Sequence, residues 1–282
     1  MLALLLAISC AVQVFSPPQP PTPGKTVPSE ADKAAIIETL LNYADGFYDG
    51  SAERMAKALH PLLSKRAVIA ANGGAPRLST MNAEMLIEVT RAGRGKLPPE
   101  QRGVKAEVLD VSGDLASARV FTAQFDDYLH LMRTADGWRI VNVLWTPPVQ
   151  APAPVDKASV AAVARDYLTA LAAKNGQAVL EALHPAATFR VAGPAPAAPR
   201  LIVQDALPDT VAEVVNTGRM PLPEDAGGSG TVAVLDAYEN IATVKIAAGP
   251  FLQYAHLAKL DGRWRIVNAL TFVQRPPQSK PQ

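Results

Sequence analysis

The sequence contains one cysteine, Cys10, in 282 residues. A single cysteine can build neither an internal disulfide framework nor a cysteine-based zinc site. An excess of charge of one sign is also lacking, since 27 Lys and Arg against 26 Asp and Glu leave a net charge of +1. Nucleic-acid binding by bulk charge needs clustered positive charge, so this balance argues against a nucleic-acid partner.

Several motifs that carry chemistry are missing as well. The glycine clusters Gly73-Gly74 and Gly227-Gly228-Ser229-Gly230 have no following lysine, so a phosphate-binding loop is unsupported. No Gly-x-Ser-x-Gly stretch marks a serine nucleophile. The four histidines include no His-x-x-x-His pair, whereas a metal needs several convergent ligands. We therefore expect no metal and no cofactor.

Apolar material, by contrast, is plentiful. Hydrophobic residues make up 49% of the chain and charged residues 19%, which is enough for a packed core and excludes a wholly disordered chain. At ~100–200 residues per domain, the length corresponds to about two domains.

The first 15 residues, MLALLLAISCAVQVF, carry no charge. They fall short of the ~20 apolar residues that a membrane-spanning helix needs, and they are typical of the apolar core of a secretory signal. We therefore predict an exported protein, periplasmic or secreted, without a membrane span. Cys10 follows Ala7-Ile8-Ser9, which leaves a lipid anchor at Cys10 as an alternative. Residues 16–28 are proline-rich and are predicted to be a linker.

An internal repeat organises the remainder of the chain. All four histidines fall into two matched pairs. Ala58-Leu59-His60-Pro61 recurs 124 residues later as Ala182-Leu183-His184-Pro185, and Tyr128-Leu129-His130-Leu131 recurs 126 residues later as Tyr254-Ala255-His256-Leu257. Trp138-Arg139-Ile140-Val141-Asn142 likewise matches Trp264-Arg265-Ile266-Val267-Asn268. We predict two copies of one domain, residues 29–146 and 157–274, joined by a proline-rich linker at 147–156 and followed by a flexible tail at 275–282.

Each copy is predicted to begin with helices and to end in an antiparallel sheet. In the first copy we expect helices over residues 29–48, 52–59 and 82–91, with Ser29 and Ser51 as N-caps and Pro61 ending the second helix. Alternating apolar residues predict strands from Gly103 onward, the last two of which span residues 125–133 and 138–145.

The first copy also resembles a known family. The stretch Tyr48–Pro61, the segment Asp127-Tyr128-Leu129-His130-Leu131 and the segment Gly137–Trp145 look like the putative lumazine-binding family, over nearly all of residues 30–146. In residues 157–274 the resemblance is looser, because Asp126-Asp127 become Leu252-Gln253 and Trp145 becomes Thr271. That family belongs to the nuclear transport factor 2-like fold, which also holds SnoaL-like cyclases and ketosteroid isomerases. The resemblance implies an α+β class with two tandem cones, in each of which a curved antiparallel sheet wraps about three helices around an apolar pocket.

Candidate ligand-binding residues follow from the polar and aromatic positions of the repeat. In the first copy they are Tyr43, His60, Asp126, Tyr128, His130 and Trp145. Their equivalents in the second copy are Tyr167, His184, Tyr254 and His256.

Two interpretations stay open for each histidine pair. His60 and His184 end a helix, where an imidazole can cap carbonyl groups or act as an acid or base at the mouth of a pocket. His130 shares one face of a strand with Tyr128 and Asp126. That set forms either a polar cluster inside the cone or a hydrogen-bonded patch that stiffens the sheet.

The sequence favours a non-enzymatic role, binding a small apolar or cyclic ligand or serving as a scaffold. The alternative is a SnoaL-like enzyme (isomerase, cyclase or hydrolase) in the first copy. The related isomerases use a carboxylate base soon after the second helix, yet residues 61–75 and 185–199 contain no Asp or Glu, so no catalytic residue is assigned. A third hypothesis is structural pairing, with the two copies packed sheet to sheet as a pseudo-dimer. Because the second copy lacks Asp126 and Trp145, we expect any ligand site in the first copy.

Overall fold

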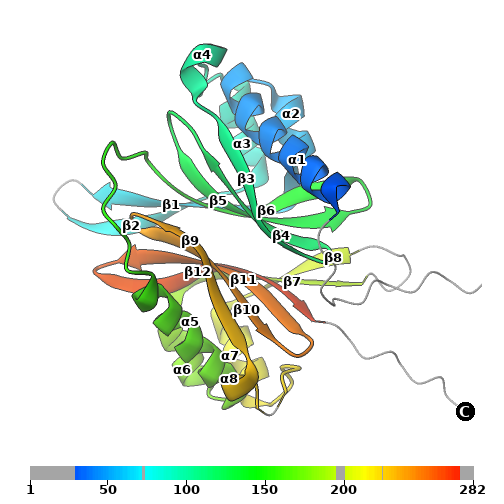
Figure 1. The fold of residues 1–282 in the computed structure, drawn as a ribbon, viewed down its shortest axis with the longest axis vertical. Coiled ribbons are helices and arrows are strands. Elements are labelled where there is room, and N and C mark those ends of the chain that lie inside the picture. Colours follow the sequence, from blue (N-terminus) through cyan, green and yellow to red (C-terminus); the bar gives the residue numbers. More distant parts are fainter. Residues whose placement is uncertain (1–28, 72–73, 195–200, 224, 274–282) are drawn as a thin grey trace, which may run out of the picture.

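The computed structural model describes residues 29–71, 74–194, 201–223 and 225–273. Within these ranges the chain forms two copies of one α+β unit, each with a six-stranded sheet that carries helices on one side (Figure 1). The predicted signal-like segment, the linker at 16–28 and the tail at 275–282 lie outside the described residues.

The elements of the two copies follow one another in the same order. The first copy comprises α1 (Glu30–Asp49), α2 (Ala52–Ala58), β1 (Leu59–Ala71), β2 (Gly74–Met81), α3 (Ala83–Arg91), α4 (Pro99–Arg102), β3 (Lys105–Ser112), β4 (Leu115–Phe121), β5 (Asp126–Thr134) and β6 (Gly137–Thr146). The second copy comprises α5 (Lys157–Ala172), α6 (Gly176–Ala182), β7 (Leu183–Pro194), β8 (Leu201–Ala206), α7 (Pro208–Asn216), α8 (Ala226–Ser229), β9 (Thr231–Tyr238), β10 (Ile241–Ala248), β11 (Phe251–Leu260) and β12 (Arg263–Val273).

Side-chain caps explain where the helices of the first copy begin. The Ser29 hydroxyl accepts a hydrogen bond from the backbone N–H of Asp32 at 3.0 Å, and the Ser51 hydroxyl accepts one from Arg54 at 3.3 Å. Each of these bonds satisfies an amide that has no partner within its helix. Both predicted N-caps are therefore confirmed.

The sheet of each copy is mixed, which corrects the expectation of a purely antiparallel sheet. Strands β3 to β6 form the predicted antiparallel meander, but β1 pairs with β6 in parallel, and the strand order is β2-β1-β6-β5-β4-β3. The second helix was predicted over residues 52–59 with Pro61 ending it, and α2 ends one residue earlier, at Ala58, because the chain enters β1 at Leu59. No strand was predicted here; Lys65 and Arg66 of β1 are both buried because both faces of the sheet are covered.

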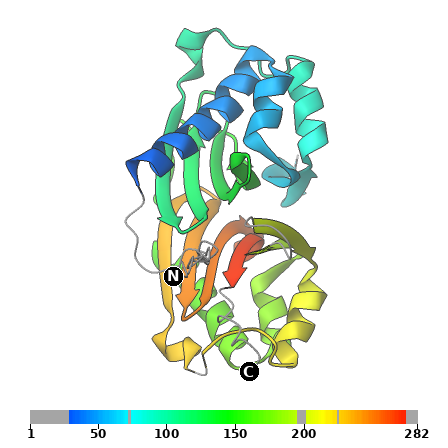
Figure 2. The same ribbon diagram turned by 90° about the vertical axis from the view of Figure 1, so that its right-hand side faces the viewer.

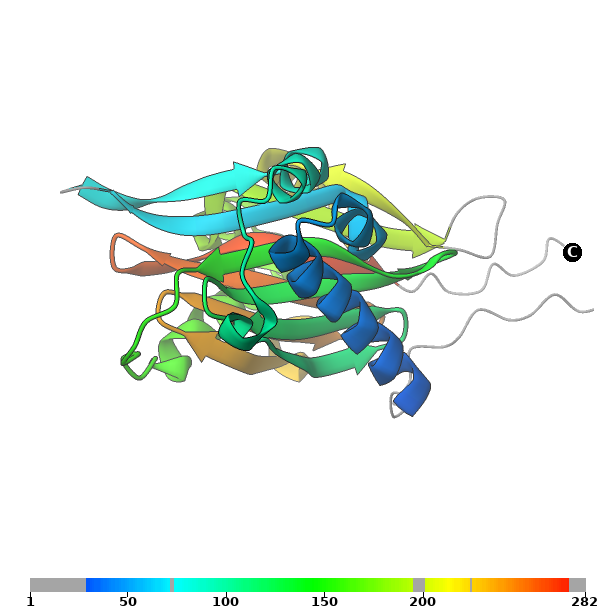
Figure 3. The same cartoon turned by 90° about the horizontal axis from the view of Figure 1, so that it is seen from above.

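The two sheets pack against each other by the faces that turn away from the helices, so the molecule has a helix–sheet–sheet–helix arrangement (Figures 1 and 2). Seen from above, the helices of the first copy lie over the strands of its sheet (Figure 3). Two apolar clusters lie between the sheets, and most members of one are repeat equivalents of members of the other. One contains Val68, Tyr128, Leu144, Ile241, Ala258, Leu260 and Val267, and the other Leu115, Met132, Val141, Ala192, Leu252, Tyr254 and Leu270. The chain therefore pairs its own two copies about a pseudo-twofold axis, as the hypothesis of structural pairing expected.

Candidate ligand-binding site

The inner face of the first sheet and the first three helices enclose a pocket of about 260 Å³. Its lining is apolar and aromatic except for a lysine, a glutamine and a tyrosine hydroxyl. The lining residues are Tyr43, Phe47, Met55, Lys65, Met81, Leu86, Val89, Gln124, Phe125 and Trp145. A mostly apolar cavity with a few convergent polar groups is the usual form of a small-molecule site.

Three polar residues meet at the floor of this pocket. Tyr43 comes from α1, Lys65 from β1 and Asp127 from β5. The Tyr43 hydroxyl donates a hydrogen bond to Asp127 Oδ2 at 2.6 Å, and Lys65 Nζ donates to the Tyr43 oxygen at 2.5 Å. Lys65 Nζ also lies 3.3 Å from both carboxylate oxygens of Asp127. We call these three residues the floor triad.

Strand geometry places Asp127 and Lys65 on the inner face of the sheet, toward the helices. Successive side chains of a strand alternate between the two faces of a sheet. Asp127 therefore points the same way as Leu129 and Leu131, which belong to the core under the helices. By the same alternation Lys65 faces inward, whereas its neighbour Arg66 reaches the second copy, where it bonds Asn268.

Burial sets the electrostatics of the triad. The side chain of Asp127 is fully buried, and that of Lys65 is 9% exposed. Burial raises the pKa of Asp127 and the neighbouring Lys65 ammonium opposes that rise, while burial lowers the pKa of Lys65 and Asp127 opposes that fall. Burial, followed by the charge of Asp127, raises the pKa of Tyr43 well above its ordinary value, so the phenol stays protonated and donates.

Aromatic rings surround the lysine. Nζ of Lys65 lies 5.1 Å from the ring centroid of Trp145, 5.3 Å from that of Tyr43 and 5.6 Å from that of Phe125. These distances are within the range of cation–π attraction. The ammonium is thus held in an aromatic cage that opens into the pocket.

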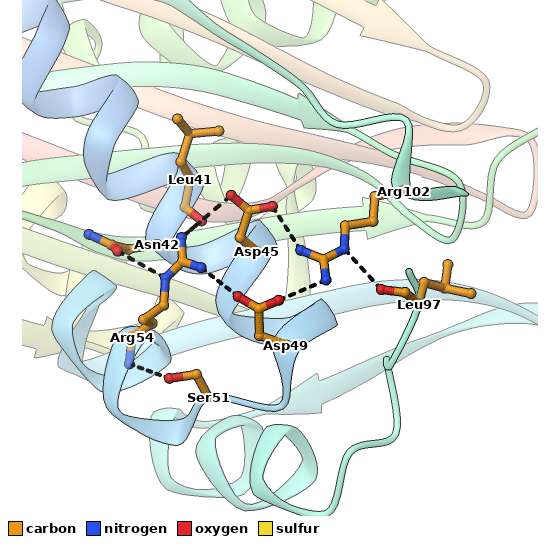
Figure 4. Close-up of polar contacts among 8 residues, drawn as sticks. All are labelled: Leu41, Asn42, Asp45, Asp49, Ser51, Arg54, Leu97 and Arg102. Carbon is orange, nitrogen blue, oxygen red and sulfur yellow. Dashed lines mark hydrogen bonds and ion pairs between the residues drawn. The ribbon is translucent and has the colours of Figure 1, made fainter. Parts of the chain in front are cut away.

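A network of ion pairs on the outside of the first copy joins α1, α2 and α4 beside the pocket (Figure 4). Arg54 binds Asp49 at 2.6 Å and Asp45 at 3.4 Å, and Arg102 binds the same two carboxylates at 2.7 and 3.4 Å. Arg102 also lies over the Tyr48 ring, 5.7 Å from its centroid. Because Tyr48 stacks on the pocket residue Phe125, this network connects the surface to the pocket wall.

The second copy has lost the charged part of this site. Sheet register places Phe189 where the first copy has Lys65, Gln253 where it has Asp127, and Thr271 where it has Trp145. Tyr167 remains, and its hydroxyl accepts a long hydrogen bond of 3.4 Å from the Gln253 amide. The inner face of the second copy therefore presents neutral groups only at these positions.

The structure brings two of the predicted site residues, Tyr43 and Trp145, into the pocket. It places His130 on the opposite face of the sheet, where the imidazole stacks on His256 with ring centroids 3.5 Å apart. Tyr128 and Tyr254 belong to the apolar clusters between the sheets, so the interpretation of Tyr128 and His130 as a polar cluster inside the cone is wrong. By the same alternation Asp126 points the same way, and burial raises its pKa.

The stacked histidines belong to a hydrogen-bonded patch at the pseudo-twofold axis. The Asn142 amide lies 3.4 Å from His130 Nδ1, and Asn268 lies 3.4 Å from His256 Nδ1. Arg190 donates to the Asn142 oxygen at 3.1 Å and Arg66 to the Asn268 oxygen at 2.9 Å. Each arginine comes from the other copy, so the patch ties the two sheets together.

His60 and His184 do not meet the other histidines. His60 Nδ1 accepts a hydrogen bond from the backbone N–H of Leu62 at 3.1 Å, and His184 Nδ1 accepts one from Ala186 at 3.0 Å. The imidazole therefore satisfies an amide at the start of the strand rather than a carbonyl at the end of the helix. His60 also lines a separate surface hollow between the copies, with Arg139 and Ile202. Burial, then the charges of Arg190 and Arg139, lowers the pKa of His60.

Lys65 and Asp127 are the site residues that the sequence analysis did not single out. An alignment of the two copies could have identified them, because Lys65 in the first copy corresponds to Phe189 in the second, and Asp127 corresponds to Gln253. Phe47, Gln124 and Phe125 were missed too, because residues in loops or on a helix edge show no pattern that points to a pocket.

Over the described ranges, no three His, Cys, Asp or Glu side chains gather into a group that could hold a metal ion. Nor does any helix in that part of the chain have the length and apolar character needed to cross a membrane.

Comparisons with solved structures find proteins that match a single copy. A nuclear transport factor 2-like protein of unknown function from Silicibacter pomeroyi is 18% identical, with 41% of this chain and 94% of that chain covered and a TM-score of 0.35. Similar proteins of unknown function from Shewanella baltica and Methylobacillus flagellatus are 23% and 22% identical. They cover 42% and 43% of this chain and 94% and 95% of their own, with TM-scores of 0.35 and 0.36. A search of curated proteins returns no match.

The family comparison is more extensive than these structural ones. The family model described as putative lumazine-binding matches residues 31–146 and again residues 155–271, which together make up most of the chain. The match reaches both copies, including the second, where the resemblance of the sequence was looser. With both matches falling on the two α+β units described above, the chain belongs to the putative lumazine-binding family and carries two tandem copies of its domain.

Proposed function

We propose that the first copy binds a small, planar, largely apolar molecule that carries a carbonyl or carboxylate oxygen, and that the second copy is its packing partner. The observation that carries this proposal is the Lys65 ammonium, buried at the floor of a pocket whose other walls are mostly apolar. A buried cation at the end of an apolar cavity favours a ligand with an acceptor oxygen at one end.

The shape of the pocket supports a flat ligand. The rings of Trp145 and Phe125 lie beside Lys65, and aromatic side chains contact planar molecules over a large area. Gln124, which also lines the pocket, offers an amide that can pair with a second polar group. A pteridine such as lumazine, which the family description names, has this combination of a flat ring and carbonyl oxygens.

The contrast between the copies supports a division of labour. The second copy keeps the residues that face the first copy, such as His256 and Asn268, but it replaces the lysine, aspartate and tryptophan of the pocket. Without the charged groups the second copy has no cation to bind the acceptor oxygen of such a ligand, whereas its contacts with the first copy remain.

The test is a titration of the protein with lumazine and with 2-naphthoate, in which binding is measured by calorimetry and by tryptophan fluorescence. The double variant Lys65→Phe/Asp127→Gln converts the floor of the first pocket into the residues that the second copy folds with. We expect it to remain folded and to bind at least about tenfold more weakly, since that is the loss for about 1.4 kcal/mol.

A matched pair of variants gives the control. Tyr43→Phe removes a hydroxyl of the floor triad, and Tyr167→Phe removes the equivalent hydroxyl of the second copy. We expect the first to weaken binding and the second to leave it unchanged. Equal effects of both variants, or no binding of either probe by the unmodified chain, would contradict the proposal.

We also propose that the protein is exported, on the basis of the uncharged apolar residues 1–15. Mass analysis of the N-terminus of protein from its native host tests this. Loss of the segment, or a lipid on Cys10, supports export, and an intact, unmodified Met1 in the cytosolic fraction would exclude it.

A further inference from the structure

The proposed site contains an amine that binding alone does not require. Among the residues that line the pocket, Lys65 carries the one amine, and its nitrogen lies at the floor with Tyr43 beside it. Asp127 touches both residues but does not line the pocket. The arrangement therefore places a nucleophilic atom toward the ligand and a carboxylate behind that atom.

We propose that Lys65 forms a reversible imine with small aromatic aldehydes that enter the pocket of the first copy. This inference rests on the proposed function, because it names one class of ligand for the same pocket. Lysine amines in desolvated sites are established nucleophiles toward carbonyl carbons.

The step balances within the residues present. Lys65 enters as an ammonium paired with Asp127 and passes one proton toward that carboxylate. The amine then attacks the carbonyl carbon, a C–N bond forms, and the carbonyl oxygen accepts a proton from the Tyr43 hydroxyl, which Asp127 replenishes. A second proton passes from the nitrogen to the carbinolamine hydroxyl, the C–O bond breaks, and that oxygen leaves as water. The product is a protonated imine that carries one hydrogen on nitrogen and keeps Asp127 as its counter-ion.

The surroundings of Lys65 favour this chemistry in two ways. Burial lowers the pKa of Lys65 and raises that of Asp127, and both shifts favour transfer of the proton to the carboxylate. The side chain of Lys65 is 9% exposed and lies beside the rings of Trp145, Phe125 and Tyr43, and a site with little water slows hydrolysis of an imine.

The chain supplies internal controls. Lys57 and Lys33 have side chains that are 61% and 43% exposed, so simple access to solvent would favour their labelling over that of Lys65, whose side chain is 9% exposed. In the second copy the equivalent position is Phe189, so no amine is present there.

The experiment treats the full chain with benzaldehyde and sodium cyanoborohydride at neutral pH and maps the benzyl adducts by peptide mass spectrometry. We expect Lys65 to be labelled about tenfold faster than Lys57 or Lys33, against the order of exposure, as an activated lysine should be. Lys65→Arg keeps the positive charge and should abolish this adduct. Tyr43→Phe should slow it about tenfold, because it removes the proton donor to the carbonyl oxygen.

Two results would overturn the inference: labelling that follows exposure, with Lys65 the slowest, or a Lys65 rate that Tyr43→Phe does not change. Thermal melts of each variant establish that it is folded. The parallel titration with 2-naphthoate separates this failure from that of the proposed function. If naphthoate binds but Lys65 is not labelled, the imine is refuted and the binding function stands, whereas absence of both refutes both.

Discussion

Acidification is predicted to destabilise the contact between the two sheets through the stacked histidines. His130 and His256 are fully buried, and the side chains that contact their ring nitrogens, Asn142, Thr243 and Asn268, are neutral. Arg190 and Arg66 hold the oxygens of the two asparagines, so the amide NH2 groups face the imidazoles. Each Nδ1 is therefore an acceptor, and the arrangement requires neutral rings.

The magnitude follows from the difference between the folded and unfolded states. Burial lowers the pKa of His130 from 6.5 to about 3, and burial together with the neighbouring His130 lowers that of His256 in the same direction. Below pH 6.5 the His130 imidazole is protonated in the unfolded chain, whereas in the folded chain it stays neutral until about pH 3. The contribution to stability is therefore complete above the unfolded pKa and decreases as the pH falls, by about 2 kcal/mol at pH 5 for His130 alone.

Urea unfolding followed by circular dichroism, at about pH 7.5 and about pH 5, measures this loss. Carboxylates titrate over part of the same range, so the comparison is with the double variant His130→Asn/His256→Asn. This variant keeps a polar side chain near Asn142 and Asn268 but cannot titrate. We expect it to be less stable at pH 7.5 yet to lose less stability between the two pH values. An unchanged loss would refute the reasoning, because the pH dependence would then come from other groups.

Two further predictions concern single buried or half-buried contacts. Asp127→Ala leaves the Lys65 ammonium buried without its carboxylate, and we expect a loss of about 3–5 kcal/mol in the free energy of unfolding, measured in urea. Asp127→Ala/Lys65→Met should recover part of that loss, and no recovery would show that the ion pair is not its cause. His60→Ala and His184→Ala each remove one hydrogen bond to a backbone amide, so each should cost about 0.5–1.5 kcal/mol. Thermal melts check this, and a larger cost for one copy alone would argue against a shared turn-capping role.

The fold was largely predictable because the repeat and the helix caps are recognisable in the sequence without knowledge of tertiary contacts. The two copies follow from matched stretches such as His60-Pro61 and His184-Pro185, and Ser29 and Ser51 form the caps that their positions predict. Strand β1 was not predictable in the same way. Its Lys65 and Arg66 are buried by tertiary contacts on two different faces, and such contacts override the polar appearance of a segment.

The site was only half predictable, for a related reason. In β5 the period of two correctly groups Tyr128 with His130 on one face, but the strand is buried on both faces from Asp126 to Met132. Where one face of a strand meets water, the polar residues identify the outside. Here neither face does, so periodicity could not tell which group of residues lines the cone and which meets the second sheet. Tyr43 and Trp145 do line the pocket, and their part in ligand binding stays a prediction.

The two faces of each sheet are under different constraints, and the repeat makes the difference measurable within one chain. Across the pseudo-twofold axis a residue contacts its own repeat equivalent, as His130 does with His256 and Ser117 with Thr243 at 3.0 Å. A change in one copy alters a surface that the other copy must match, so both copies keep the histidine and the asparagine behind it. The inner faces meet only their own helices and can diverge independently. Lys65 and Asp127 in the first copy against Phe189 and Gln253 in the second are such a divergence. Because a buried ion pair is a costly replacement for an apolar core, its presence in one copy alone implies a demand on that copy beyond folding.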